Sequence, residues 1–362
     1  MKHVRVLAGV LISALFLYLA LRGVHFSEVG AALRGANYFW LVPATAALVA
    51  SLALRALRWR LLFYPRDDLR FGAVFGAMNV GYLVNDLLPM RLGEVVRAYL
   101  LSQVERVSVA RAFSTVAVER VLDMVVTLAY LAAVLPFVSL PEGAGGKVAV
   151  ISLLAVGALM VMMIAGALRE RTHDMARIVT ARIPRRHAGR LHGLLDQFLH
   201  GFAVLSAGRV AFMAAALSLV VWGTAALALY FVLFAFHLRL SPVAPIFVLA
   251  LVSLSFVVPA SPGYVGVFHL AAVSALRAFD VDESVALSYA VVAHIVAFAP
   301  PMLLGAGYLW RTGTSWNRIF AFRSAAPAES EHPTPQAPNS GVGVEVDAEP
   351  EPAASGSARF RA

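Results

Sequence analysis

Long uninterrupted apolar stretches recur along this chain, and they constrain its fold more than any other feature. A helix needs about 20 apolar residues to cross about 30 Å of bilayer hydrocarbon. Six stretches reach or approach this length: residues 4–21, 39–57, 113–139, 148–168, 210–236 and 285–310. The sequence therefore predicts an all-α, polytopic membrane protein with about six full spans.

The composition agrees with a chain whose solvent is the bilayer. Of the 362 residues, 60% are hydrophobic and only 14% are charged, whereas an average soluble domain is about half apolar and about a quarter charged. This excludes an ordinary soluble enzyme, a disordered protein and a nucleic-acid-binding domain. The net charge of +9 fits loops that face an anionic leaflet. The chain has no cysteine, which excludes disulfides and thiolate metal sites.

Two further apolar regions are interrupted before they reach spanning length. Residues 71–83 run into Asn85 and Pro89. Residues 243–258 run into Pro259, after which a further apolar stretch covers residues 264–278. A 15-residue helix reaches only about 22 Å, so each region is predicted to form a re-entrant helical hairpin. One hairpin in each half, entering from opposite faces, indicates an inverted repeat around a central binding site. The alternatives are prolines that mark interfacial loop ends and a fold of seven or eight plain spans.

The arginines set the expected orientation, because cytoplasmic loops are enriched in them. The second span leads into a basic segment that includes Arg55, Arg58, Arg60, Arg66 and Arg70. Its Arg58-Trp59-Arg60 motif is typical of an interfacial anchor. This segment and the basic loop 169–209 can both lie in the cytoplasm only if the hairpins are re-entrant. Both termini are then expected in the cytoplasm as well.

Two segments outside the spans differ from them in residue pattern or composition. Residues 191–205 carry apolar side chains at helical spacing, which predicts either a helix lying on the membrane surface or a plain cytosolic connector. Residues 324–362 are rich in proline, alanine and acidic residues, which predicts a disordered tail. The membrane domain is therefore expected to cover residues 1–323.

The first break carries a candidate anion site. Arg91, Glu94 and Arg97 follow one another at intervals of three residues, so neighbours would share one face of a short helix. Arginine forms a planar fork that matches phosphate oxygens, and Glu94 could hold one guanidinium in place. Gly93 would permit close backbone approach. These residues predict a site for an anionic lipid headgroup; the alternative is a salt-bridged helix at the interface.

A second cluster, Glu119, Arg120 and Asp123, lies near the start of a span. Charges within a span are costly and usually pair or serve a function. The two carboxylates share a helix face, so they could brace Arg91 or Arg97, bind a cation or carry protons. Local pairing at the cytoplasmic interface is the alternative.

The second break contains Ser261, Pro262, Gly263 and Gly266, and His269 follows it. A helix that begins near Tyr264 would point free amides at an anion. His294 lies inside the last span, where it is either a hydrogen-bonded core residue or part of a proton relay.

The chain contains no nucleophile elbow, zinc-protease motif, Walker A motif or dinucleotide turn. We therefore expect no catalytic residue, cofactor or bound metal.

These residues resemble a known family. The runs NDLLPMRLGEVVR (85–97), ERVLD (119–123) and PASPGYVG (259–266), followed by His294, are similar in type and order to the lysylphosphatidylglycerol synthase transmembrane-region family of bacteria and archaea, across about residues 1–315. In full-length synthases a soluble aminoacyl-transferase domain follows this region, which moves the modified lipid between leaflets. The resemblance gives Pro89 as a shared motif position. The other shared positions, which we take as candidate binding residues, are Asn85, Arg91, Gly93, Glu94, Arg97, Glu119, Arg120, Asp123, Ser261, Pro262, Gly263, Gly266 and His294.

The resemblance implies lipid translocation in the cytoplasmic membrane of a prokaryote, without aminoacylation, and it leaves the lipid unidentified. Membrane lipids with anionic headgroups are the expected partners. Two other hypotheses remain open. One is an integral membrane enzyme that uses Glu119 or Asp123 as a base. The other is an accessory factor for enzymes of glycolipid or envelope synthesis.

Overall fold

The structure is a computed structural model that describes residues 2–66, 68–88, 91–138, 208–257 and 261–315. The regular structure of the described residues consists of helices, without a strand. The α-helices are α1 (Lys2–Leu21), α2 (Phe26–Gly35), α3 (Leu41–Leu61), α4 (Phe71–Leu87), α5 (Leu92–Glu105), α6 (Val109–Val134), α10 (Gly208–Ala235), α11 (Val243–Ser255), α12 (Val267–Arg277) and α13 (Glu283–Thr312). The short 3-10 turns are η1 (Tyr38–Trp40), η3 (Leu135–Phe137) and η5 (Pro262–Tyr264).

Four of the described segments are long and apolar enough to cross a membrane: Tyr38–Leu61, Val109–Phe137, Gly208–Ala235 and Glu283–Thr312. They match four of the six expected spans to within four residues at either end, and α1 matches the first. The expected span 148–168, the helix at 191–205 and the tail at 324–362 lie outside the described residues. The chain is thus an all-α polytopic membrane protein, as its apolar stretches predicted.

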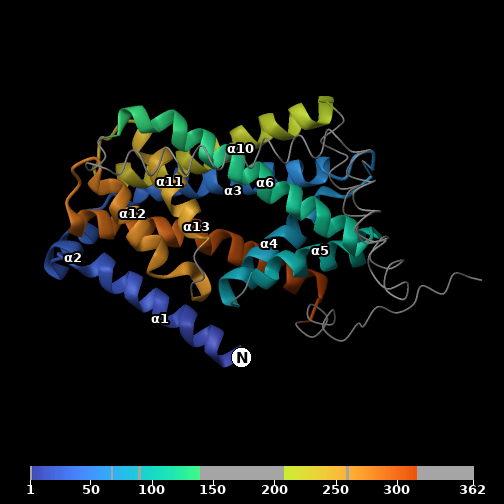
Figure 1. Cartoon of the computed structure of the whole chain (residues 1–362), viewed down its shortest axis with the longest axis horizontal. Helices are drawn as coiled ribbons and strands as arrows, with labels where there is room; N and C mark the ends of the chain where they lie inside the picture. The colour runs from blue at the N-terminus through green and yellow to red at the C-terminus, as the bar shows by residue number, and fades with distance from the viewer. Residues whose placement is uncertain (1, 67, 89–90, 139–207, 258–260, 316–362) are drawn as a thin grey trace, which may run out of the picture. The chain divides into compact units, whose positions relative to one another are not determined.

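Both expected hairpins are present. The first hairpin is α4 packed against α5, and the second is α11 packed against α12, with η5 between them. These helices have 17, 14, 13 and 11 residues, so none is longer than about 26 Å. Figure 1 shows α4 and α5 side by side in teal, apart from α11 and α12 in yellow to orange.

Each hairpin lies in its own hydrophobic core, and the four long helices reach both cores. The core around the first hairpin takes in the end of α3, the start of α6, the start of α10 and the end of α13. The core around the second hairpin takes in the opposite end of each of these helices. The unit α3–α6 therefore runs in the opposite sense to the unit α10–α13. This is the inverted repeat that the two breaks indicated.

Glycines allow the first hairpin to pack closely. A methyl group on Gly93 would overlap the carbonyl oxygen of Gly81, so the backbones of α5 and α4 touch at this point. On its other side α4 meets α13, where a methyl group on Gly305 would lie 2.5 Å from the carbonyl oxygen of Asn79. Small residues at helix contacts are the usual device for tight packing within a membrane.

Two local expectations were wrong. The helix after the second break begins at Val267 rather than near Tyr264, because η5 and the N-cap Gly266 precede it. In addition, α3 continues to Leu61, so the Arg58-Trp59-Arg60 motif is the last turn of a helix and Arg58 is fully buried.

Candidate functional site

A buried cluster of charged side chains joins α3, α5 and α6. We call it the charge cluster. Its members are Arg55, Arg58, Glu94, Arg97, Glu119, Arg120 and Asp123. Helical spacing builds it, since Arg55 and Arg58 are three residues apart on α3, and Glu119 and Asp123 are four apart on α6. These faces meet because α5 packs against α6 and α3 also contacts α6.

Glu119 is the centre of the charge cluster and is fully buried. Its Oε2 accepts a hydrogen bond from Nη1 of Arg97 at 2.9 Å. Its Oε1 accepts from Nη2 of Arg120 at 3.1 Å and lies 3.3 Å from Nη2 of Arg58. One carboxylate therefore holds three guanidinium groups, each from a different helix.

Asp123, one helical turn further along α6, shares Arg58 and Arg120 with Glu119 and also contacts Arg55. Its Oδ1 lies 2.8 Å from Nη1 of Arg58, and its Oδ2 lies 3.4 Å from both Nη1 of Arg55 and Nη2 of Arg120. The indole of Trp222, on α10, donates to Oδ1 at 3.0 Å. The carboxylate is thus fixed by cations and by a neutral donor from the second repeat.

Positive charge exceeds negative charge in the charge cluster, which contains four arginines and three carboxylates. Among the described residues, no hydrogen-bond acceptor satisfies Nε and Nη2 of Arg58, Nη2 of Arg97 or Nε of Arg120. A buried donor without a partner costs about 1–3 kcal/mol. The arrangement would therefore be stabilised by one further anion.

Exposure rises from the centre of the charge cluster to one edge. The side chains of Arg58 and Glu119 are 0% exposed and that of Arg97 is 3% exposed. Arg120 is 35% exposed and Glu94 is 22% exposed, with Nε of Arg120 3.7 Å from Oε1 of Glu94. A ligand would therefore first meet the edge formed by Arg120 and Glu94.

Arg91 does not share a helix face with Glu94 and Arg97, contrary to the spacing argument. It is the N-cap of α5 in the left-handed conformation, with φ of 52°, and this conformation turns its side chain away from the face of α5. Its Nε donates to the hydroxyl of Tyr264 at 3.0 Å and its Nη2 to the carbonyl oxygen of Phe256 at 2.6 Å. Arg91 thus connects the tips of the two hairpins and lies outside the charge cluster.

Two other residues of the first break have structural contacts. The side-chain Oδ1 of Asn85 accepts from the backbone N–H of Gly93 at 2.8 Å, which satisfies a free amide at the start of α5. Gly93 is buried against α4, so its close backbone approach is to another helix. Pro89 lies outside the described residues.

Residues of the second break contact α1 and α13. The N–H of Ser261 donates to Oγ of Ser13 at 2.7 Å, and Gly266 is so close to α1 that a methyl group on it would overlap the carbonyl oxygen of Ser13. Pro262 begins η5, and Nε2 of His294 contacts the carbonyl oxygen of Gly263 at 2.8 Å. Pro259 lies outside the described residues.

Sequence reasoning missed four members of this region. Arg55 and Arg58 were assigned to an interfacial segment, although their spacing places them on one face of an apolar helix. Trp222 and Ser218 lie on α10, far away in the sequence, and Oγ of Ser218 accepts from Nη1 of Arg58 at 2.9 Å. Only the packing of α10 on α3 brings them together.

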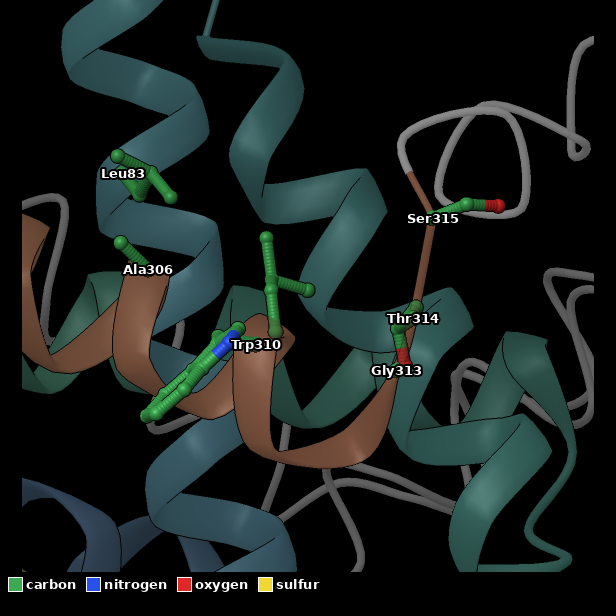
Figure 2. Close-up of a pocket in the computed structure, with 7 residues that line it drawn as sticks. Leu83, Ala306, Trp310, Gly313, Thr314 and Ser315 are labelled. Atoms are coloured by element: carbon green, nitrogen blue, oxygen red, sulfur yellow. The ribbon is translucent and has the colours of Figure 1, made fainter.

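A separate pocket lies between α4 and the end of α13. It has a volume of about 420 Å³ and is lined by Leu83, Ala306, Leu309, Trp310, Gly313, Thr314 and Ser315. Figure 2 shows the indole of Trp310 at this pocket, with Leu83 across from it on α4. None of the lining residues belongs to the charge cluster, so the pocket and the charge cluster are separate.

Comparison with known proteins identifies relatives in archaea. Glycosyltransferase AglD of Haloferax volcanii is 26% identical over 337 residues, which cover 84% of this chain and 54% of that protein. UPF0104 membrane proteins from Methanocaldococcus jannaschii and Methanothermobacter thermautotrophicus are 27% and 26% identical, over 62% and 75% of this chain and 91% and 85% of those proteins. The chain thus spans about half the length of the relative named a glycosyltransferase.

A family comparison covers most of the chain. The profile described as the lysylphosphatidylglycerol synthase TM region matches residues 6–305, which include the charge cluster and both hairpins. The chain therefore belongs to the lysylphosphatidylglycerol synthase transmembrane-region family.

Proposed function

We propose that this protein binds an anionic phospholipid or lipid-linked headgroup at the charge cluster and moves it between the leaflets of the cytoplasmic membrane. In this proposal Arg120 meets the headgroup first, and Arg58 and Arg97 hold the carboxylates in place. Glu119 and Asp123 keep the guanidinium groups apart and oriented. Both chain termini would face the cytoplasm.

The observation that carries the proposal is the excess of positive charge in the charge cluster, together with its unsatisfied donor atoms. Three of the four arginines in the charge cluster have donor atoms without hydrogen-bond partners among the described residues. A phosphodiester supplies one negative charge and several acceptor oxygens, and guanidinium groups match its geometry. Binding would neutralise the excess charge and satisfy some of the free donors.

The meeting of the two hairpins supports movement across the membrane. Short broken helices at membrane depth tend to line substrate sites in transporters with inverted repeats. Here Arg91 joins the first hairpin to the second through Phe256 and Tyr264. A headgroup moving through a polar path at this junction could leave its acyl chains in lipid.

The relatives support a role in lipid or glycolipid metabolism. One relative is named a glycosyltransferase, and the family is named after the membrane region of a lipid synthase. The first name favours a second candidate function, in which the chain serves an enzyme that acts on a lipid-linked sugar. This candidate predicts a chemically altered lipid in cells that lack the protein, whereas translocation predicts only a change in leaflet.

The test is a sidedness assay in proteoliposomes. A phosphatidylglycerol analogue and a phosphatidylcholine analogue, each fluorescent, are placed in one leaflet, and their appearance in the other is followed by chemical quenching. We expect faster transfer of the anionic analogue and a loss of that difference in Arg120→Gln. Arg277→Gln is the matched control, because Arg277 forms an exposed pair with Glu283. Equal transfer of both analogues, or wild-type behaviour of Arg120→Gln, would contradict the proposal.

A further inference from the structure

Two ionisable side chains pack against each other in the second repeat, whereas the charge cluster is built mainly from the first. We call His269 on α12 and His294 on α13 the histidine pair. Their ring centroids are 5.0 Å apart. His269 is 7% exposed, His294 is half-buried, and the rings of Phe268 and Phe298 pack around them. Ionisable side chains are rare in such surroundings and generally serve a function.

The inverted repeat relates this place to the charge cluster. In each repeat the second helix of the hairpin follows an N-cap of positive φ, which is Arg91 at 52° and Gly266 at 85°. Glu119 lies 27 residues after the start of α5, and His294 lies 27 residues after the start of α12. His294 therefore lies in the part of its repeat that corresponds to the Glu119–Arg120 segment of the first. One repeat carries fixed charges and the other carries groups that can gain a charge.

The hydrogen bonds define where a proton could be added. The carbonyl oxygen of Gly263 can only accept, so Nε2 of His294 donates to it at 2.8 Å and Nδ1 is left to take a proton without breaking this bond. The N–H of Gly266 can only donate, and it lies 3.4 Å from Nδ1 of His269. A proton on that nitrogen would end this contact. The first proton therefore goes to Nδ1 of His294.

The surroundings allow the pair to carry one proton at a time. Two imidazolium rings at this separation would repel each other strongly. Among the described residues, no Asp or Glu side chain contacts either ring. The other titratable groups of the junction are Tyr264 on η5 and, from the first hairpin, Asp86 and Arg91. The neighbouring part of α1 contributes the hydroxyl of Ser13.

Proton binding would act on the junction between the hairpins. Gly263 accepts from His294 and lies against the backbone of Asp86 at the end of α4. A charge gained by His294 would strengthen its bond to Gly263 and so bias the position of the second tip against the first. We infer that the histidine pair is a proton-binding site that couples proton movement to headgroup translocation, an inference that rests on the proposed function.

The test measures transfer of the fluorescent phosphatidylglycerol analogue in proteoliposomes of the full chain, with a pH gradient of either polarity and without one. We expect one polarity to accelerate transfer severalfold. In His294→Gln the ratio of rates with and without the gradient should fall to one, since glutamine can still donate to Gly263 but does not titrate. His237→Gln, which alters an exposed histidine after α10, should keep the wild-type ratio.

A second measurement follows protons directly. Purified protein in detergent is acidified in the presence of an indicator dye, and the His269→Gln/His294→Gln double variant should take up about one proton fewer than the wild type. Transfer that ignores the gradient in the wild type, an unchanged ratio in His294→Gln, or equal proton uptake would overturn the inference. Absence of any transfer in the wild type would instead overturn the proposed function, and the coupling with it.

Discussion

Replacing Glu119 with glutamine removes the fully buried carboxylate of the charge cluster, which contacts three guanidinium groups. Nη1 of Arg97, Nη2 of Arg120 and Nη2 of Arg58 lie 2.9, 3.1 and 3.3 Å from its two oxygens, and the side chain is 0% exposed. The amide can accept from the arginines only through its oxygen, while its NH2 group faces another donor. The excess positive charge of the charge cluster would rise by one.

The expected cost is about 3–5 kcal/mol of unfolding free energy, because removing one partner of a buried ion pair leaves uncompensated charge. The assay is equilibrium denaturation in detergent, followed by tryptophan fluorescence. Trp59 lies 4.8 Å from the guanidinium of Arg97 and Trp222 donates to Asp123, so two tryptophans report on this region directly.

Glu283→Gln is the matched control for this measurement. Glu283 pairs with Arg277 at 2.8 Å, but the two side chains are 26% and 62% exposed. An exposed pair of this kind contributes about 0.2–1 kcal/mol. If Glu119→Gln costs no more than Glu283→Gln, then the charge cluster does not depend on Glu119 as argued.

Three further variants test the packing and the hydrogen bonds around the site. Gly93→Ala should separate the first hairpin and lower folded yield strongly, whereas Gly72→Ala should be tolerated, since a methyl group there meets no atom within 4 Å; detergent size-exclusion profiles of both variants distinguish these outcomes. Trp222→Phe removes a donor to Asp123 and should cost about 1–3 kcal/mol in denaturation, with an unchanged midpoint counting against that bond. Arg58→Lys should also destabilise, because a single ammonium group cannot reproduce the planar guanidinium contacts with Glu119, Asp123 and Ser218; wild-type unfolding in this variant would contradict the assigned geometry.

The long helices could be predicted because length and apolar content alone decide whether a segment can span. The hairpins could be predicted because the apolar stretches 71–83 and 243–258 are too short to cross the membrane. Both inferences need only local sequence.

The charge cluster could be predicted only in part. Glu119, Arg120 and Asp123 were evident because they interrupt an apolar span. Arg58 was not, since a basic residue near the end of a span is usually an interfacial anchor, and its partners lie on α6 and α10, 61 to 160 residues away in the sequence.

Arg91 was assigned to the wrong neighbours for a different reason. The spacing rule for helix faces holds only inside a helix, and the left-handed N-cap conformation of Arg91 gives its side chain another direction. Its partners, Phe256 and Tyr264, belong to the other repeat and leave no mark in the local sequence.

The most direct test of the charge cluster as an anion site compares two variants of one contact. Arg120 and Glu94 lie 3.7 Å apart at its exposed edge, so Arg120→Gln and Glu94→Gln both break this pair and change the net charge in opposite directions. Arg120→Gln also removes the contacts with Glu119 and Asp123. Native mass spectrometry would measure how strongly each purified protein retains phosphatidylglycerol over phosphatidylcholine. We predict a weaker preference for the anionic lipid in Arg120→Gln and a stronger one in Glu94→Gln. Shifts of the same sign, or no shift in either variant, would contradict binding of an anionic headgroup at this edge.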